Sequence, residues 1–285
     1  MYNSLKGMLA EASNRKMTLC EIILENETKH SEKSIEEIFE ELEYRCEIMK
    51  NSTQRAILDS DSLKETFISG MAKTQDEYAN RDDTLCGKTI NKVMARALSC
   101  SEVNAAMGKI CAMPTAGSCG IVPAVLFTVA EECNASKEEL LNAFVIASGV
   151  GAVVVENATV SGAEGGCQAE CGVAAGMAAA GATYLKGGSN EECIESFAIS
   201  LINIMGLVCD PVAGLVQIPC AQRNASQGVN ALLSADLALG GMKCGIAADD
   251  VIEAMYKVGK LMPIQHKETS LGGIATTESG KSYKI

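Results

Sequence analysis

The stretch Gly172–Ala182 reads GVAAGMAAAGA and contains no polar side chain. Small residues at this density let helix backbones approach each other closely, which is typical of a helix buried on all sides. The stretch is too short to cross a bilayer, because a membrane-spanning helix needs about 20 apolar residues. It therefore predicts a central helix packed between other helices, and it favours an all-α fold.

The helices around this centre can be recognised by their first residues. The segments Ser136–Glu139, Ser189–Glu192 and Ser34–Glu37 each place a Ser three residues before a Glu, at the start of an apolar-periodic run. This pattern is a capping box, in which side chains satisfy the first free N–H groups of a helix. After Ser34 the apolar residues recur at helical spacing and predict an amphipathic surface helix: Ile35, Ile38, Phe39, Leu42, Cys46 and Met49.

Patterns typical of strands are scarce. The apolar run 152–155 is too short to outweigh the helical signals, and residues around 235–255 predict further helices. The mostly polar segment 64–83 predicts a connection into the main body. We expect an N-terminal helical region over residues 1–75 and a larger helical domain over 76–285, joined in one continuous domain.

Composition and charge narrow the class of partner. The chain has 285 residues, 47% of them hydrophobic, only 4% aromatic and none of them Trp, and its formal net charge is −12. Such a charge argues against a nucleic acid or an anionic membrane as partner, because both require clustered Lys and Arg. Charged residues interrupt the N-terminal segment 1–24, and no uncharged span resembles an anchored membrane helix. We expect a cytoplasmic protein that binds a small molecule or another protein.

Thirteen cysteines is a high and odd number. A secreted disulfide scaffold is usually shorter and has an even count, whereas a cytosolic chain keeps its thiols reduced and can use some of them to bind a metal. A free Cys otherwise behaves as a small apolar side chain. We expect this packing role for the cysteines in helical contexts, namely Cys20, Cys46, Cys133, Cys193 and Cys244.

Three short segments combine Cys with turn-forming Gly and Pro: 111–120, 162–172 and 209–220. Glycines beside a cysteine leave backbone N–H groups free to donate to a thiolate or an inorganic sulfide, which suits a charged cluster in a dry interior. The spacing alone decides little, because no CxxC or ferredoxin pattern occurs, and Cys167 and Cys171 are also spaced like stacked residues on a helix. A metal site and a buried thiol network both remain open from spacing.

At these residues the chain resembles the iron–sulfur-dependent L-serine dehydratases, specifically the alpha chain of the two-subunit type. The resemblance runs from about Lys88 to Ala275, and its motifs stand in the family's order. These motifs are VNAAMGKI at 103–110, PTAGSCG at 114–120, GAEGGCQAE at 162–170, CDPVAGLVQIPCAQRN at 209–224 and ETSLGGIA at 268–275. The resemblance implies that a [4Fe-4S] cluster lies at the heart of an all-α catalytic domain and that its ligands are Cys167, Cys209 and Cys220.

Other cysteines near these motifs match no ligand of the family. We expect Cys111, Cys119 and Cys171 to be packing residues. In some single-chain relatives a C-terminal cysteine folds back onto the cluster, whereas the segment 282–285 reads SYKI. We therefore do not expect the C-terminal tail to play that part here.

The ligand count implied by the resemblance suggests a reaction. Three thiolates on a four-iron cluster leave one iron without a protein ligand, and an open iron is a Lewis acid. We expect it to bind the hydroxyl of L-serine while a base removes the α-proton, giving water and aminoacrylate, and finally pyruvate and ammonia. Pyridoxal phosphate is not expected: Lys109 is the sole Lys or Arg between Arg96 and Lys137, and no clear phosphate-binding loop accompanies it. Lys109 is instead interpreted as a helix-end residue or a partner of the substrate carboxylate.

Several polar residues are candidates for contacts with the substrate. Thr115, Gly117 and Ser118 offer hydroxyl and backbone donors for a carboxylate, although they also fit a Pro-initiated turn into a helix. Arg223 and Asn224 follow Cys220 and are candidates for contacts with the substrate or around the cluster, or for a salt bridge at a helix start.

The chain offers few candidates for the general base, because it has only two histidines. His30 is expected on the surface, and His266 is a candidate. Glu164 and Glu170 lie in an otherwise uncharged stretch, so each is expected to be buried and to act as an acid or base or as a helix cap. Glu164 is the second candidate. In the two-subunit family a beta chain accompanies the alpha chain, and the resemblance implies that such a partner completes the pocket of a hetero-oligomer.

Two alternatives remain at this stage. The same scaffold suits a lyase for L-threonine or L-cysteine, because the cluster chemistry tolerates another leaving group. A non-catalytic metal or thiol module, which only binds or regulates a partner subunit, would hold zinc or no metal.

Overall fold

A computed structural model of the chain describes residues 2–284, and within them it contains helices and no strand. A single β-bridge links Cys209 to Lys267. The predicted all-α fold is thus confirmed. The α-helices are α1 (Leu5–Arg15), α2 (Leu19–Ser31), α3 (Ile35–Leu58), α4 (Met71–Ala79), α5 (Gly87–Ala105), α6 (Ile121–Glu132), α7 (Lys137–Asn157), α8 (Gly162–Gly165), α9 (Val173–Leu185), α10 (Asn190–Ile202), α11 (Cys220–Leu239), α12 (Ala248–Leu261) and α13 (Glu278–Ser282). The shorter turns are η1 (Ser60–Ser62), η2 (Gln168–Gly172), η3 (Val212–Gly214), η4 (Ile264–His266) and η5 (Gly273–Thr276).

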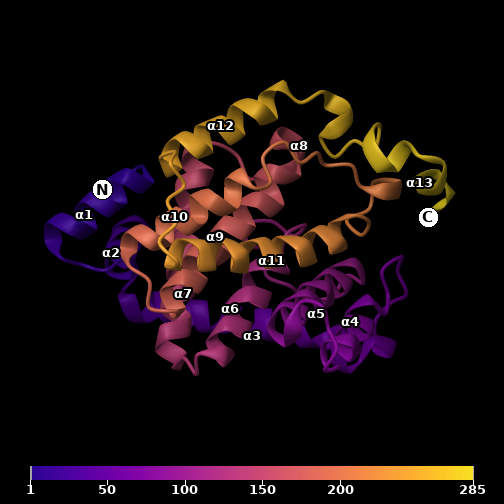
Figure 1. The fold of residues 1–285 in the computed structure, drawn as a ribbon, viewed down its shortest axis with the longest axis horizontal. Helices are drawn as coiled ribbons and strands as arrows, with labels where there is room; N and C mark the ends of the chain where they lie inside the picture. Colours follow the sequence, from indigo (N-terminus) through magenta and orange to yellow (C-terminus); the bar gives the residue numbers. More distant parts are fainter. Residues whose placement is uncertain (1, 285) are drawn as a thin grey trace.

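Helix α9 is the centre of the molecule, as its sequence predicts (Figure 1). Every residue from Val173 to Thr183 is buried, and α6, α7, α10 and α11 pack around the helix. A Cβ atom on Gly176 would lie 2.5 Å from the Phe197 ring of α10, and one on Gly181 would lie 2.9 Å from the Ala143 carbonyl oxygen of α7. Glycine at these two positions therefore sets how closely the neighbouring helices approach.

The three predicted capping boxes are all present. Ser34, Ser136 and Ser189 each accept a hydrogen bond from the backbone of a Glu three residues later, whose side chain accepts from the Ser backbone. A fourth box, Thr18–Glu21, starts α2. Helix α3 buries Cys46 and Met49 against the core and exposes its other face, as an amphipathic helix does.

The segment 64–83 differs from the expected connection, because it contains helix α4. The start of α4 depends on the buried Glu102 of α5, whose carboxylate accepts hydrogen bonds from the Gly70 N–H at 2.9 Å and the Ala72 N–H at 2.6 Å. Ile68 and Ala72 are fully buried beside it. A cap supplied by another helix leaves no local signal, and the polar composition therefore misled the prediction.

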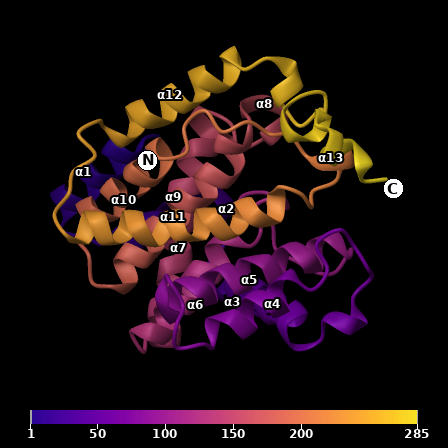
Figure 2. The same ribbon diagram turned by 45° about the vertical axis from the view of Figure 1, so that its right-hand side comes forward.

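The predicted helices around residues 235–255 are present as the end of α11 and the start of α12, separated by a turn at 240–247. Figure 2 shows α11 and α12 running across one side of the α7–α9–α10 bundle, with α3–α6 on the other side of α11. After α12 the chain continues through η4 and η5, and η5 packs against η3 and α13. The division near residue 75 stays a prediction.

Helix α7 is the one helix in the described part of the chain that is long and apolar enough to cross a membrane. Of its most apolar 18-residue window, 61% is buried inside the protein, where α7 packs against α9. Its apolar character is thus accounted for by the core.

All thirteen cysteines are free thiols. Of those expected to pack in helices, Cys20, Cys46 and Cys193 are buried, and Cys133 and Cys244 are half-buried.

Candidate active site

The three predicted ligand cysteines come from separate elements and meet beside α8. Cys167 lies between α8 and η2, Cys209 lies in the loop before η3, and Cys220 is the first residue of α11. Cys167 and Cys209 are 2% and 4% exposed, and Cys220 is half-buried. Burial, followed by the charge of Cys167, raises the pKa of the Cys209 thiol well above its usual range and that of Cys220 to about 12. The thiols are therefore close enough to interact, and a positive charge or a metal is needed to hold all three as thiolates.

Cys171 takes a different part from Cys167. It lies inside η2, which is a single π-helical turn, a rare form that often marks functional sites. The pKa of Cys171 is raised by its hydrogen bond with Cys167 and by complete burial. The same hydrogen bond, helped by the charge of Arg223, lowers the pKa of Cys167. Cys171 is thus placed as a protonated thiol that donates to the Cys167 sulfur.

Two carboxylates stand beside the cysteines around Gly162. A Cβ atom on Gly162 would lie 3.0 Å from Glu170 Oε2, 3.2 Å from Cys209 Sγ and 3.6 Å from Glu268 Oε2. The absence of a side chain at Gly162 therefore lets two carboxylates and one ligand sulfur approach the backbone closely. Within residues 2–284 no Lys or Arg forms an ion pair with Glu170 or Glu268, so their negative charge is not neutralised by the chain described.

The predicted turn at residues 115–118 forms the opposite wall. Thr115 donates its hydroxyl hydrogen to Glu170 Oε1 and also hydrogen-bonds Ser118 Oγ at 3.0 Å. Gly117 faces the same carboxylate, because its Cβ atom would lie 2.5 Å from Glu170 Oε1. Burial raises the pKa of Glu170, the hydrogen bond from Thr115 opposes this, and the charge of Glu268 adds to it. Glu170 is thus a half-buried carboxyl group suited to holding or releasing a proton.

Asn224 has a structural part in this wall. Its side chain is 1% exposed and joins α11 to the turn. Nδ2 donates to the Gly117 carbonyl at 2.7 Å and to the Cys220 carbonyl at 2.9 Å, while Oδ1 accepts from the Gly120 N–H at 3.0 Å. All the side-chain polar atoms of Asn224 are therefore used within the chain, and none points to a substrate.

Arg223 reaches across the site from the first turn of α11. Its Nη1 donates to the Val208 carbonyl at 2.8 Å, and its Nη2 pairs with Asp210 Oδ1 at 2.8 Å. The positive charge of the guanidinium also helps to lower the pKa of the Cys167 thiol. Asp210 is 2% exposed, and its Oδ2 accepts from the Ile274 N–H at 2.8 Å in η5. The Arg223 guanidinium, one candidate for substrate contact, thus forms its polar contacts within the protein.

Comparison with known proteins shows the family to which the chain belongs. The family model described as serine dehydratase alpha chain matches residues 14–275. The chain belongs to the serine dehydratase alpha chain family. It is 43% identical over 284 residues to "L-serine dehydratase, alpha chain" of Peptoniphilus asaccharolyticus, covering 100% of this chain and 97% of the relative. It is 40% identical to "Probable L-serine dehydratase, alpha chain" of Bacillus subtilis (strain 168), covering 100% of this chain and 94% of the relative.

A third relative shows how this family relates to longer chains. "L-serine dehydratase 1" of Escherichia coli (strain K12) is 36% identical over 290 residues, which cover 96% of this chain but 61% of that protein. Alpha chains of this family therefore correspond to a part of the longer dehydratases.

The remaining predicted candidates are Lys109, Glu164 and His266. Lys109 is exposed and hydrogen-bonds the Tyr44 hydroxyl at 2.7 Å. Glu164, expected to be buried, is exposed in the first turn of α8. The His266 carbonyl accepts from the Cys209 N–H at 2.9 Å, while its buried Nδ1 has no hydrogen-bond partner. Glu164 is therefore corrected from a buried to a surface residue, because the short α8 turns that side outward.

The iron–sulfur group implied by the family fits the donor set. Three converging thiols offer soft ligands, and Gly162, Gly165 and Gly166 surround Cys167 with backbone. Within residues 2–284 no three His, Cys, Asp or Glu side chains are close enough to hold a single metal ion. A four-iron cluster is larger than one ion, so its ligands stand farther apart. Cys167, Cys209 and Cys220 would hold it, with the Cys171 thiol and the positive charge of Arg223 both acting on the Cys167 sulfur.

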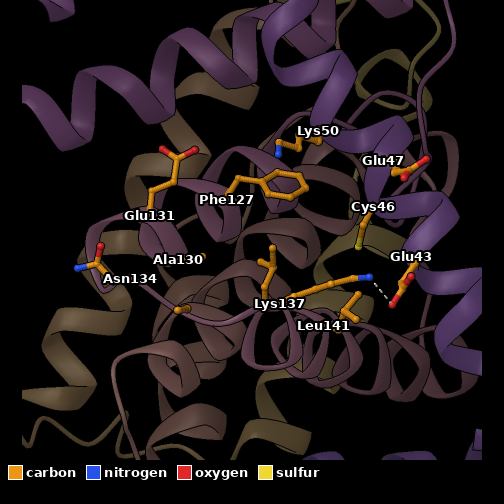
Figure 3. Close-up of a pocket in the computed structure, with 12 residues that line it drawn as sticks. Glu43, Cys46, Glu47, Lys50, Phe127, Ala130, Glu131, Asn134, Lys137 and Leu141 are labelled. Carbon is orange, nitrogen blue, oxygen red and sulfur yellow. Dashed lines mark ion pairs between the residues drawn. The ribbon is translucent and has the colours of Figure 1, made fainter. Parts of the chain in front are cut away.

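A separate cavity of about 650 Å³ lies between α3 and the α6–α7 junction (Figure 3). Its wall includes Phe127, Cys46 and the ion pair of Lys137 with Glu43, whose atoms are 2.7 Å apart. None of the three ligand cysteines lines it. The candidate active site is therefore not in this cavity.

Sequence reasoning missed two residues of the site, Glu268 and Asp210. Glu268 stands in the quoted motif 268–275, but the motif gave no sign that its carboxylate faces Glu170. Asp210 was the one charged residue between Met205 and Gln222, which is a signal that a buried partner exists. Its ion-pair partner, Arg223, was predicted separately as a candidate site residue.

Proposed function

We propose that this chain is the catalytic alpha chain of an L-serine ammonia-lyase, which converts L-serine to pyruvate and ammonia with a [4Fe-4S] cluster on Cys167, Cys209 and Cys220. The observation that carries the proposal is the convergence of three thiols from separate elements with two carboxylates that no Lys or Arg of residues 2–284 neutralises. Family membership supports the substrate, because the relatives are named as L-serine dehydratases.

The residues around Gly162 divide the work of the reaction. When bound, the cluster supplies a Lewis-acidic iron for the hydroxyl that leaves as water. Glu170 accepts the α-proton of the substrate, since its carboxylate lies beside Gly162, as the Cys209 sulfur does, and burial raises its pKa. Thr115 holds the Glu170 carboxylate in place. Aminoacrylate then tautomerises and takes up water to release ammonia and pyruvate, so that no water is consumed or produced overall.

A beta chain is part of the proposal, because the relatives are named as alpha chains. The C-terminal segment supports it. Leu261, Ile264 and Leu271 are 84%, 60% and 65% exposed and lie within ten residues of Glu268 in the sequence. Several exposed apolar side chains in one segment favour a surface that a partner covers. We assign this surface to the beta chain, and the double variant I264E/L271E should lose the beta chain on size-exclusion chromatography while it keeps its helical circular dichroism.

The decisive experiment is iron and acid-labile sulfide analysis of the anaerobically purified protein. We expect about four iron and four sulfide per chain, and pyruvate release from L-serine when the beta chain is present. Single replacement of Cys167, Cys209 or Cys220 by Ser should abolish cluster retention, whereas Cys171→Ser should retain it. Stoichiometric zinc without sulfide would refute the proposal and favour a non-catalytic thiol module.

The same preparation tests which amino acid is the substrate. Release of pyruvate, 2-oxobutyrate and sulfide from L-serine, L-threonine and L-cysteine separates the proposed activity from lyases on the same scaffold.

We also propose that the protein acts in the cytoplasm, where its thirteen free thiols stay reduced. Fractionation of cells that express the chain checks that location.

A further inference from the structure

One guanidinium joins all three segments that carry the ligand cysteines. Arg223 belongs to the first turn of the helix that Cys220 begins. Its Nη1 donates to the carbonyl of Val208, the residue before Cys209, at 2.8 Å, and its positive charge lowers the pKa of the Cys167 thiol. Cys167 lies 42 residues before Cys209 in the sequence, so this interaction links a distant segment to the other two.

A fourth segment is attached through Asp210. Arg223 Nη2 and Asp210 Oδ1 are 2.8 Å apart, and Asp210 Oδ2 accepts from the Ile274 N–H at 2.8 Å. Gly273 packs directly on this carboxylate, with φ +59° and a position where a Cβ atom would lie 2.0 Å from Asp210 Oδ2. The turn η5 is thus fixed to the cysteine site by the same ion pair.

We propose that Arg223 is a positioning residue for the cluster: its planar guanidinium sets the relative placement of the three ligand segments and places a fixed positive charge beside the Cys167 sulfur. The inference rests on the proposed function, since it concerns the ligands of the cluster. Of the three roles predicted for Arg223 from the sequence, it favours contacts around the cluster over contact with the substrate. Arginine suits this part because its five donors lie in one rigid plane and it stays charged, whereas Lys is a single flexible point charge.

Two properties of the bound cluster follow from this placement. Outer contacts that orient metal ligands usually contribute about 10- to 100-fold in metal affinity. A positive charge beside a ligand sulfur also stabilises the reduced, more negative cluster, and so raises its reduction potential. A residue that merely fills space would affect the first property but not the second.

The test uses the wild-type protein and the variants R223Q and R223K, purified anaerobically with the beta chain. Iron and sulfide content, the rate of cluster loss to a chelator, and the reduction potential by spectroscopic titration are measured for each. We expect R223Q to lose the cluster at least tenfold faster and to have a more negative potential. R223K should keep a potential near that of wild type, because the charge remains, and should lose the cluster faster, because the planar contacts are gone.

Arg96 provides a matched control. It is also a buried guanidinium, 7% exposed, paired with Glu131 at 2.7 Å, but at the opposite end of α6 from the cysteine site. R96Q should lose stability to heat without a change in reduction potential. If R223Q does not fold, R223K decides, because a lysine variant with wild-type cluster loss would refute the need for the planar group.

The outcomes separate this inference from the proposed function. A wild-type protein without iron and sulfide overturns both. A wild-type protein with its cluster, together with an R223Q variant of unchanged potential and unchanged cluster loss, overturns the positioning role of Arg223 alone.

Discussion

Replacing Gly117 by Ala tests the geometry of the wall around Glu170. The added Cβ atom would lie 2.5 Å from Glu170 Oε1 and 3.0 Å from Glu170 Cδ. Ordinary contact begins at 3.4 Å, so the carboxylate must move by about 0.9 Å. Such a move breaks the hydrogen bond that Glu170 accepts from Thr115. The substitution is small, lies outside any helix and leaves all charges in place.

The size of the effect follows from these contacts. Loss of a hydrogen bond to a charged group costs about 1.5–3 kcal/mol, and a strained side-chain rotamer costs about 0.5–1.5 kcal/mol. The lower chain entropy of Ala in the unfolded state offsets about 0.4–1 kcal/mol. We expect G117A to lower the free energy of unfolding by about 1–4 kcal/mol. For a chain of this size that corresponds to a fall in Tm of about 2–8 °C.

Thermal unfolding followed by circular dichroism measures the effect, on the purified protein and again after removal of iron by a chelator. The double-mutant cycle with E170A isolates the contact, because a truncated Glu170 has no atom to clash with. In the E170A background G117A should cost less than about 0.5 kcal/mol. An equal cost of G117A in both backgrounds would show that the reasoning about Glu170 is wrong. The neighbouring exposed position Ala116, as A116S, serves as the control and should change Tm little.

Three further predictions concern the core, the turn and pH. Phe197→Ala removes a fully buried ring that packs on Gly176, so calorimetry should show a loss of about 3–5 kcal/mol. Asn224→Ala leaves the Gly117 carbonyl and the Gly120 N–H without partners, and urea unfolding should show a loss of about 2–4 kcal/mol. Burial raises the pKa of Glu170 in the folded protein, so this carboxyl group contributes stability that is present below its unfolded pKa and is lost as pH rises through its folded pKa. Glu170→Gln should therefore gain in Tm relative to wild type between pH 4 and pH 7, and a gap that narrows with rising pH would contradict the assignment.

The fold could be predicted where the signal is local. The capping boxes at Ser34, Ser136 and Ser189 determine helix starts through residues three positions apart, and the composition of 172–182 requires close packing on every side. Helix α4 could not be predicted in this way, because its start is stabilised by Glu102 from another helix. Local patterns thus find those elements whose ends are satisfied locally.

The site was less accessible to sequence reasoning, because its members are brought together by the fold. Glu164 and Glu170 look alike in the sequence, yet the π-helical turn directs Glu170 toward Thr115 while Glu164 faces solvent. Motif order indicated the ligand cysteines through the family, but the spacing did not. Charge gave a usable clue, since an isolated Asp210 in an apolar stretch required a partner.

The charge balance of the site links the two proposals. Three thiolates and two carboxylates place several negative charges close together, and Arg223 is the one Lys or Arg of residues 2–284 whose charge lowers the pKa of Cys167 and of Cys220. Arg223 is itself shared with Asp210, so it can neutralise only part of this charge. The iron of a cluster offsets the thiolates, and the ammonium group of an amino acid suits the remaining carboxylates. A substrate without an amino group, such as a simple 2-hydroxy acid, should therefore bind more weakly than L-serine, because its carboxylate would meet Glu170 and Glu268 without a compensating charge.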